Sequence, residues 1–149
     1  MAGTVWLSER EERIWRRWMT LNAELTAAMQ RQMQAEAGLS MSDYEVLVHL
    51  TDDPAGRIRV TDLAGLLQWE RSRVSHHVTR MEHRGLVERE ECADDGRGAY
   101  VAITTGGRTA IEQAAPGHAQ VVRRLVFDAL EVDEVRCLET VIDKLLSRT

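Results

Sequence analysis

The stretch from residue 60 to residue 104 constrains the fold more than any other part of this chain. Two short helical patterns meet there at a tight turn, and two short strand patterns follow. The first helical pattern covers about residues 61–68, with Thr61 as the expected N-cap. The short link after it favours a compact helix pair, with Trp69 filling the gap between the helices. One buried face of this helix is expected at the three- and four-residue spacing of Leu63, Leu66 and Leu67.

The second helical pattern, at about residues 71–84, separates an apolar stripe from a polar, basic face. Positions three and four residues apart share one side of a helix, which defines a stripe of Val74, Val78 and Met81. The opposite face is formed by Ser72, His76, Thr79, Arg80 and His83, with Arg73 and Arg84 beside it and His77 at its border.

The charge of this helix differs in sign from that of the whole chain. The helix holds four arginines and one glutamate, a local net charge of +3, whereas the chain carries −5. A positive field confined to one helix attracts a polyanion at that place. The alternative interpretation is an ordinary amphipathic surface helix with a solvated basic face.

A glycine and a hairpin pattern follow the basic helix. Gly85 fits a left-handed C-cap. Residues 86–89 and 99–103 alternate as strands do, and the polar, glycine-rich residues 93–98 between them indicate a hairpin tip. Two helices joined by a turn and followed by such a wing are a device for reading DNA.

We therefore predict DNA contacts from the basic helix and from the hairpin tip. In the tip, Asp95 can hold the guanidinium of Arg97 by a charge-assisted hydrogen bond, and an arginine so held suits a narrow minor groove. The alternative is a solvated turn with an incidental ion pair. The predicted contact residues are Ser72, Arg73, Ser75, His76, His77 and Arg80 on the helix, and Asp95 and Arg97 in the wing.

Long helices are predicted on both sides of this block. A capping box at Ser8–Glu11 opens the first, and a second box at Ser42–Glu45 opens the next. A third helix runs from about Thr105 past Pro116, which should kink or interrupt it.

Two apolar seams in the first and last helices need partner helices. Their members alternate three- and four-residue spacings, as in helices that pack along their length. A two-fold dimer with interlocked terminal helices covers both seams, and the alternative is a helical subdomain within one chain. The predicted dimerisation residues are Ile14, Trp18, Leu21, Leu25, Leu138, Ile142 and Leu145.

Other chemistry finds little support in the residues. The five histidines and two cysteines show no zinc-like spacing, and no phosphate loop or nucleophile elbow is present. We therefore expect no enzyme activity, no catalytic residues, no metal and no cofactor. No apolar run reaches the roughly 18 residues of a membrane span, and no signal-peptide pattern or disulfide framework is evident. We expect a cytoplasmic protein without a membrane partner.

The central motifs resemble the MarR family of bacterial transcription regulators. The similarity lies in the pattern VSxxVxRMExRGLVER, an Asp-x-Arg in the wing, and a strand that ends in I-T-x-x-G. The matching positions are Val74, Ser75, Val78, Arg80, Met81, Glu82, residues 84–89, Asp95, Arg97, Ile103, Thr104 and Gly107. The last helix is similar through Leu130, Asp133, Glu134, Leu138, Ile142 and Leu145. The chain departs from the family at Glu70, where a Ser or Thr cap is usual, and at Trp69, where a smaller aliphatic residue is usual.

The resemblance implies a mostly α fold, a winged helix-turn-helix with flanking N- and C-terminal dimerisation helices. It implies one domain over residues 1–149, with the DNA-binding lobe at about 42–104 and the dimerisation helices at about 8–36 and 105–147. It also implies a homodimer that binds a pseudo-palindromic operator on double-stranded DNA, commonly as a repressor.

Many members of this family bind a small aromatic effector between the dimer helices and the DNA-binding lobe. The residues that are candidates to line such a pocket here are Trp15, Trp18, Met29 and His49. The alternative function is a ligand- or protein-binding module with the same fold that lacks specific DNA binding. The acidic net charge and Glu70 favour that alternative, because a carboxylate near DNA phosphates repels them.

Overall fold

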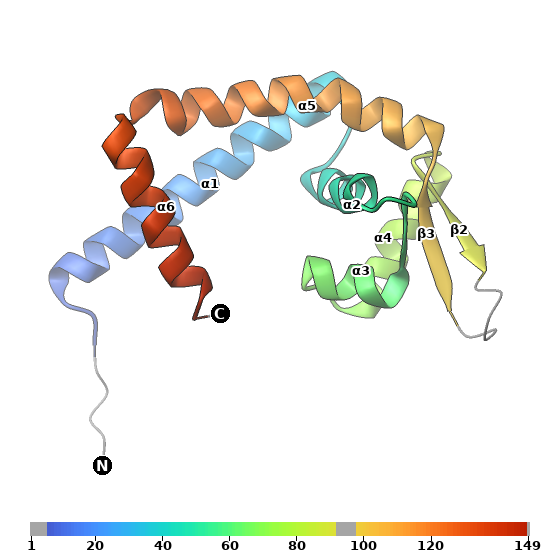
Figure 1. The fold of residues 1–149 in the computed structure, drawn as a ribbon, viewed down its shortest axis with the longest axis horizontal. Coiled ribbons are helices and arrows are strands. Elements are labelled where there is room, and N and C mark those ends of the chain that lie inside the picture. Colours follow the sequence, from blue (N-terminus) through green and yellow to red (C-terminus); the bar gives the residue numbers. More distant parts are fainter. Residues whose placement is uncertain (1–5, 92–97, 149) are drawn as a thin grey trace, which may run out of the picture. The chain divides into compact units, whose positions relative to one another are not determined.

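The computed structural model describes residues 6–91 and 98–148. In chain order the elements are α1 (Glu9–Ala37), α2 (Met41–Asp52), β1 (Arg57–Arg59), α3 (Val60–Leu67), α4 (Arg71–His83), β2 (Val87–Glu91), β3 (Ala99–Ile103), α5 (Thr105–Leu125), the 3₁₀ turn η1 (Phe127–Ala129) and α6 (Val132–Leu146) (Figure 1). The expected class, mostly α with a small antiparallel sheet, is confirmed.

The chain divides into two compact units. One unit comprises Met1–Met29 and Gln120–Thr149, and the other comprises Gln30–Ala119. The first contains most of α1, the end of α5, and α6. The second contains the remaining parts of α1 and α5 together with α2, α3, α4 and the sheet, and we call it the central unit.

The central unit is built on an apolar core. The predicted stripe of α4 is confirmed, since its three apolar side chains are fully buried. α1, α2, α3, α5 and β3 supply the other walls, so each of these amphipathic elements buries one face. The fully buried apolar side chains are Met33, Leu39, Val46, Leu47, Leu50, Leu63, Val74, Val78, Met81, Val101 and Ala114.

The end of α4 follows the glycine signal in the sequence. Gly85 has a φ of +72°, a left-handed conformation that costs glycine little. The amide of Leu86 donates to the Met81 carbonyl at 3.0 Å, and the amide of Gly85 donates to the Glu82 carbonyl at 2.9 Å. These two bonds form a Schellman motif, which stops the helix and directs the chain into β2.

The starts of two other helices differ from the prediction. The Ser8–Glu11 box is present, but α2 is capped by Ser40 and not by Ser42. Ser40 and Asp43 form a reciprocal capping box, because a short carboxylate at the third helical position closes it as well as the Glu that the pattern sought. Thr61 does not cap α3, whose N-cap is Arg59 without a side-chain bond.

The buried face of α3 also differs in one position. Leu63 is fully buried, whereas Leu66 is 54% exposed and Ala64 takes a buried position beside Leu63. The helix has only eight residues and ends at Gln68 in the left-handed conformation, so one turn packs against the core and the last turn does not.

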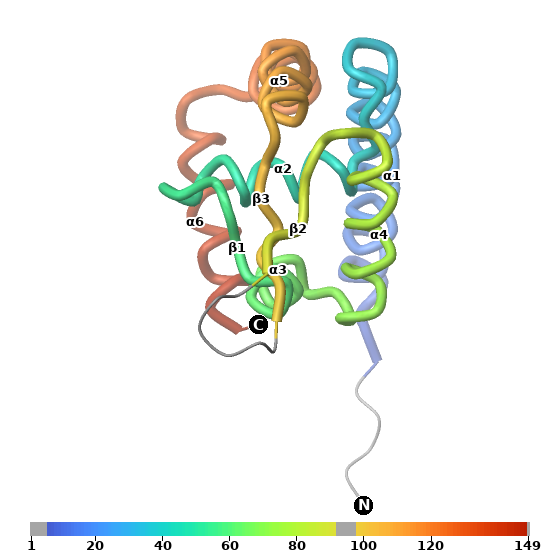
Figure 2. Tube along the Cα trace, turned by 90° about the vertical axis from the view of Figure 1, so that its right-hand side faces the viewer, coloured from blue at the N-terminus to red at the C-terminus, as the bar shows by residue number. Residues whose placement is uncertain are grey.

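The sheet has three strands in the order β1-β3-β2, all antiparallel (Figure 2). The hairpin of β2 and β3 is as expected, with Arg89 opposite Val101. β1 was not predicted, and it places Ile58 opposite Val101 on the other side of β3. This strand joins the turn after α2 to the wing, so the wing base is held from both edges.

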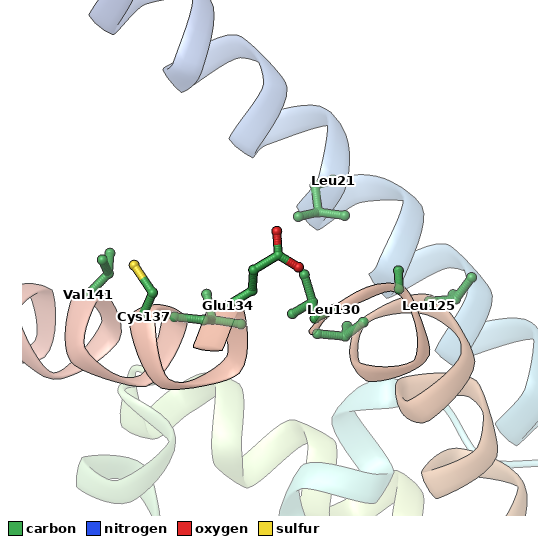
Figure 3. Close-up of a pocket in the computed structure, with 9 residues that line it drawn as sticks. Leu21, Leu125, Leu130, Glu134, Cys137 and Val141 are labelled. Carbon is green, nitrogen blue, oxygen red and sulfur yellow. The ribbon is translucent and has the colours of Figure 1, made fainter. Parts of the chain in front are cut away.

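The other unit exposes much of its apolar surface. Of its described residues only Val121 is buried, and α6 buries none of its residues. An apolar groove on this unit, which we call the α6 groove, lies between α1 and α6, with the Glu134 carboxylate pointing toward Leu21 (Figure 3). The groove is lined by Leu21, Leu125, Val126, Ala129, Leu130, Glu134, Cys137, Leu138 and Val141.

Three further observations concern the helices. The interruption expected at Pro116 is absent, because α5 continues through it as one helix. Close by, the side chain of Gln32 donates to the Ala114 carbonyl at 3.1 Å and ties the two helices of the central unit together. Within the described part of the chain, no helix is long and apolar enough to cross a bilayer.

Candidate nucleic-acid interface

The exposed face of α4 carries most of the predicted contact residues. Ser72, Arg73, Ser75, His76 and Arg80 are all exposed, on the side opposite the buried stripe or on its flanks. The burial of that stripe fixes which way the face points, because a helix anchored along one side cannot rotate. Side chains on one exposed helical face are the arrangement that enters a DNA major groove.

Trp69 positions the first arginine of this face. The guanidinium of Arg73 lies 4.0 Å from the centre of the Trp69 ring, a close cation–π contact. Trp69 itself is half-buried and meets the ring of His77 edge-on, with the ring centres 5.4 Å apart. The residue that departs from the family pattern thus packs the turn and also supports Arg73.

His77 does not lie on the exposed face, contrary to expectation. It is only 7% exposed, and its Nε2 lies 3.0 Å from Asp43 Oδ1 on α2. The carboxylate is off the direction of the ring N–H, so the contact is electrostatic and not a linear hydrogen bond. Buried imidazole at this position cannot reach a base edge, and we leave His77 out of the contact surface.

Asp43 is the buried centre of this polar cluster. Burial by itself would raise the pKa of its carboxyl, but the contacts from His77, Arg84 and Ser40 outweigh burial and lower the pKa below its usual value. Arg84 Nη1 donates to Asp43 Oδ2 at 2.7 Å, and Arg84 Nη2 donates to the Gly38 carbonyl at 2.6 Å. Arg84 is therefore engaged with α2 and does not add a free charge to the face of α4.

A second ion pair, between Arg89 on β2 and Glu82 on α4, connects α4 to the sheet. Arg89 on β2 donates to Glu82 at 3.0 Å and to the Ser75 carbonyl at 2.8 Å. Glu82 is thereby paired with Arg89, and Arg73 and Arg80 are the exposed arginines among the predicted contact residues of α4.

A pocket that the sequence did not reveal lies at the base of the wing. It has a volume of about 430 Å³ and contains the side chains of two arginines. Arg59 of this pocket also donates to the Tyr100 hydroxyl at 3.3 Å. The sequence analysis included Arg89 only as a position of the family motif. It did not predict β1, which carries Arg59, because those three residues have no strand pattern of their own. The pocket is lined by Arg59, Val60, Thr61, Ser75, Arg89, Gly98 and Ala99.

The predicted wing contacts cannot be placed. Asp95 and Arg97 lie outside the described residues. The strands that lead to the tip are described up to Glu91 and from Gly98.

A second pocket of the central unit lies against α2, and we call it the α2 pocket. It has a volume of about 470 Å³ and includes His49, one of the four candidate effector residues. The rings of Tyr44 and His118 meet there at 4.8 Å, and burial lowers the pKa of His118 and raises that of Tyr44. The α2 pocket is lined by Met41, Tyr44, Glu45, Val48, His49, Leu66, Leu67, Trp69 and His118.

The other three candidate effector residues lie in the first unit. Trp15 and Trp18 are 53% and 40% exposed on α1, and Met29 is half-buried at the end of that unit.

The arrangement of α3, the turn, α4, β2 and β3 defines a winged helix-turn-helix protein. The comparisons with known proteins agree with this class. Residues 37–98 match the model of the MarR family. The structure of AbsC, a MarR family transcriptional regulator from Streptomyces coelicolor, is similar with a TM-score of 0.90 and 35% identity, over 97% of each chain.

Two more relatives extend the comparison. Sco3205, a MarR family transcriptional regulator from the same organism solved in complex with DNA, has 34% identity and a TM-score of 0.90, over 98% of this chain and 91% of that one. The transcriptional repressor MprA of Escherichia coli K12 is 25% identical over 130 residues, which are 87% of this chain and 73% of MprA. The chain belongs to the MarR family of transcriptional regulators. Members of this family are not enzymes, which confirms that expectation.

Proposed function

We propose that this regulator is a homodimeric, sequence-specific repressor that binds a pseudo-palindromic operator on double-stranded DNA in the cytoplasm. The observation that carries the proposal is the exposed face of α4, with Arg73 supported by Trp69 and Arg80 beside it. Sco3205, which is similar over nearly the whole chain, was solved with DNA. MprA is a repressor, which supports the same sign of regulation here.

We assign the reading of DNA bases to α4, and contact with the DNA phosphate backbone to the base of the wing. Arginine can pair with both acceptors of guanine in the major groove, and Arg73 and Arg80 have the exposure that this needs. The pocket at the wing base, whose lining includes Arg59, is the proposed phosphate contact, which would position the protein without reading sequence. Arg97 remains our proposed minor-groove contact.

The apolar surface of the first unit supports the proposed dimer. Ile14, Trp18 and Leu21 on α1 are 57%, 40% and 45% exposed, and Ile142 and Leu145 on α6 are 38% and 53% exposed. Exposed apolar residues in such number indicate an association surface, and the α6 groove lies among them. A second copy of the chain is the proposed occupant, because two-fold pairing covers both seams at once. Its operator half-sites are then about 10 bp apart, or a multiple of that spacing.

The α2 pocket is the proposed site of a small aromatic effector. Its volume falls within the range of about 300–1,000 Å³ typical of ligand pockets, and its walls combine apolar and aromatic side chains with two histidines. Trp69 lines the pocket and also contacts Arg73, so an occupant would lie next to the support of a proposed base-reading residue. Release of the operator by benzoate, measured as a loss of fluorescence anisotropy and reduced by His49→Ala, tests this part.

The main test is a gel shift of the pure protein against its own upstream region, with excess non-specific competitor DNA. We expect a retarded band, and we expect Arg73→Ala and Arg80→Ala each to weaken operator binding by about 1–3 kcal/mol. Glu139→Ala on α6 is the control and should bind as the parent does. A protein that never shifts its upstream DNA would favour the alternative, a ligand- or protein-binding module, to which the exposed Glu70 at the start of α4 also points.

A further inference from the structure

Three polar side chains form a continuous chain from the interior of the central unit to the exposed face of α4. Asp43 on α2 is 1% exposed, and its carboxylate lies 3.0 Å from Nε2 of His77. The other ring nitrogen of His77, Nδ1, lies 2.9 Å from Nη2 of Arg80. Arg80 is exposed, so the chain ends on the surface that we assign to DNA.

The two neighbours of the His77 ring indicate which tautomer it adopts. The Asp43 carboxylate lies beside Nε2, off the direction of the ring N–H, and its negative charge electrostatically favours the tautomer that carries the proton there, which leaves the lone pair of Nδ1 free. Arg80 has only donors and is always charged, so the contact exists only if Nδ1 accepts. Asp43 thus selects the form of His77 that can hold the Arg80 guanidinium.

The ring is also fixed in place. His77 is 7% exposed, and Trp69 meets it edge-on at 5.4 Å. Asp43 is held in turn by Arg84 and by the amide of Ser40 at 2.8 Å. A long arginine side chain on a surface normally samples many rotamers, and a fixed acceptor reduces that freedom before binding.

We propose that His77, oriented by Asp43, is a positioning residue that presents the Arg80 guanidinium for base contact. The inference rests on the proposed function of α4. It gives a buried residue a part in recognition without any contact to DNA, and it links α2 directly to the reading surface. A structural role alone would place His77 in the core but would not make its effect depend on Arg80.

The test is a double-mutant cycle on His77 and Arg80. The affinities for the operator and for random DNA are measured for the parent, His77→Phe, Arg80→Ala and the double variant at one salt concentration. His77→Phe keeps an aromatic ring against Trp69 and removes the acceptor. We expect it to lower the ratio of operator to random affinity about tenfold, within the range of an arginine–guanine contact. In the Arg80→Ala background it should change the ratio less than about twofold.

A conservative variant and a spectroscopic measurement complete the test. His77→Gln keeps a donor for Asp43 and an acceptor for Arg80. This variant should therefore retain most of the parent's ratio of operator affinity to random-DNA affinity. The ¹⁵N shifts of His77 in the parent should show the proton on Nε2, a readout that needs no variant to fold. The opposite tautomer would overturn the inference, and so would a His77→Phe effect of equal size in both backgrounds.

The outcomes separate this inference from the function on which it rests. A parent protein that prefers its operator, with a preference unchanged in His77→Phe, overturns the positioning role alone. A parent protein without any preference overturns the proposed function and the positioning role together.

Discussion

Replacing Leu145 by aspartate tests whether α6 belongs to a dimer interface. Leu145 is 53% exposed in the single chain, and α6 has no buried residue. In a monomer the change affects a half-exposed position and should cost little stability. In a dimer the same position is covered by the partner, and the carboxylate would lose its water.

The size of the expected effect follows from this exposure. Complete burial of a leucine side chain contributes about 1.5–3 kcal/mol, so covering the exposed half contributes about 1 kcal/mol. A two-fold interface contains the residue twice, which gives about 2 kcal/mol. Since each 1.4 kcal/mol corresponds to tenfold, the dimer Kd should rise at least about 30-fold, before the desolvation of two carboxylates is added.

Sedimentation equilibrium over a range of protein concentrations measures this shift. Thr140→Asp is the matched control, because it places the same charge on the opposite face of α6. We expect Thr140→Asp to remain as dimeric as the parent. A Leu145→Asp protein with the parent's dimer Kd would refute the assignment of α6 to the interface.

Three further predictions concern the central unit. Trp69→Leu removes the cation–π contact with Arg73, so operator affinity should fall by about 0.5–1 kcal/mol, and a loss that persists in the Arg73→Ala background would contradict this reason. The pKa of Asp43 is lowered by folding, so its contribution is present above the unfolded pKa of about 4 and is lost as the pH falls below it. The free energy of unfolding, measured with urea, should therefore fall more steeply between about pH 5 and 2 in the parent than in Asp43→Asn. Equal pH dependence in the two proteins would refute this role of Asp43. Gly85→Ala should cost about 1–2 kcal/mol of unfolding free energy because of the left-handed φ, and an unchanged urea midpoint would contradict that.

The recognition helix could be predicted because its signals are local. Val74, Val78 and Met81 mark one face within three turns, and Gly85 marks the end. The register of α4 therefore follows from the sequence, and with it the exposure of Arg73 and Arg80.

The structure differs from the sequence prediction at positions whose burial or pairing depends on residues far away in the chain. His77 lies at the border of the polar face by periodicity, and only Asp43, on another helix, draws it inside. β1 has three residues and no alternation of its own, and it exists because β3 pairs with it. Leu66 has the spacing of a buried residue, but the core does not extend to that end of α3.

One close approach also explains a motif glycine. Any Cβ at Gly107 would lie 2.1 Å from the carbonyl oxygen of Leu86, so the start of α5 can lie against the start of β2 only with glycine there. The sequence showed the glycine as part of a pattern, and the structure supplies its physical reason.

The central claim is that the exposed face of α4 reads a particular DNA sequence. The most direct measurement is the ratio of Kd values for a scrambled duplex and for the protein's own upstream operator, by fluorescence anisotropy at one salt concentration. The account predicts a ratio of at least about 10³, as for specific regulators, and a steep fall of that ratio in Arg73→Ala. Equal affinity for the two duplexes would contradict it.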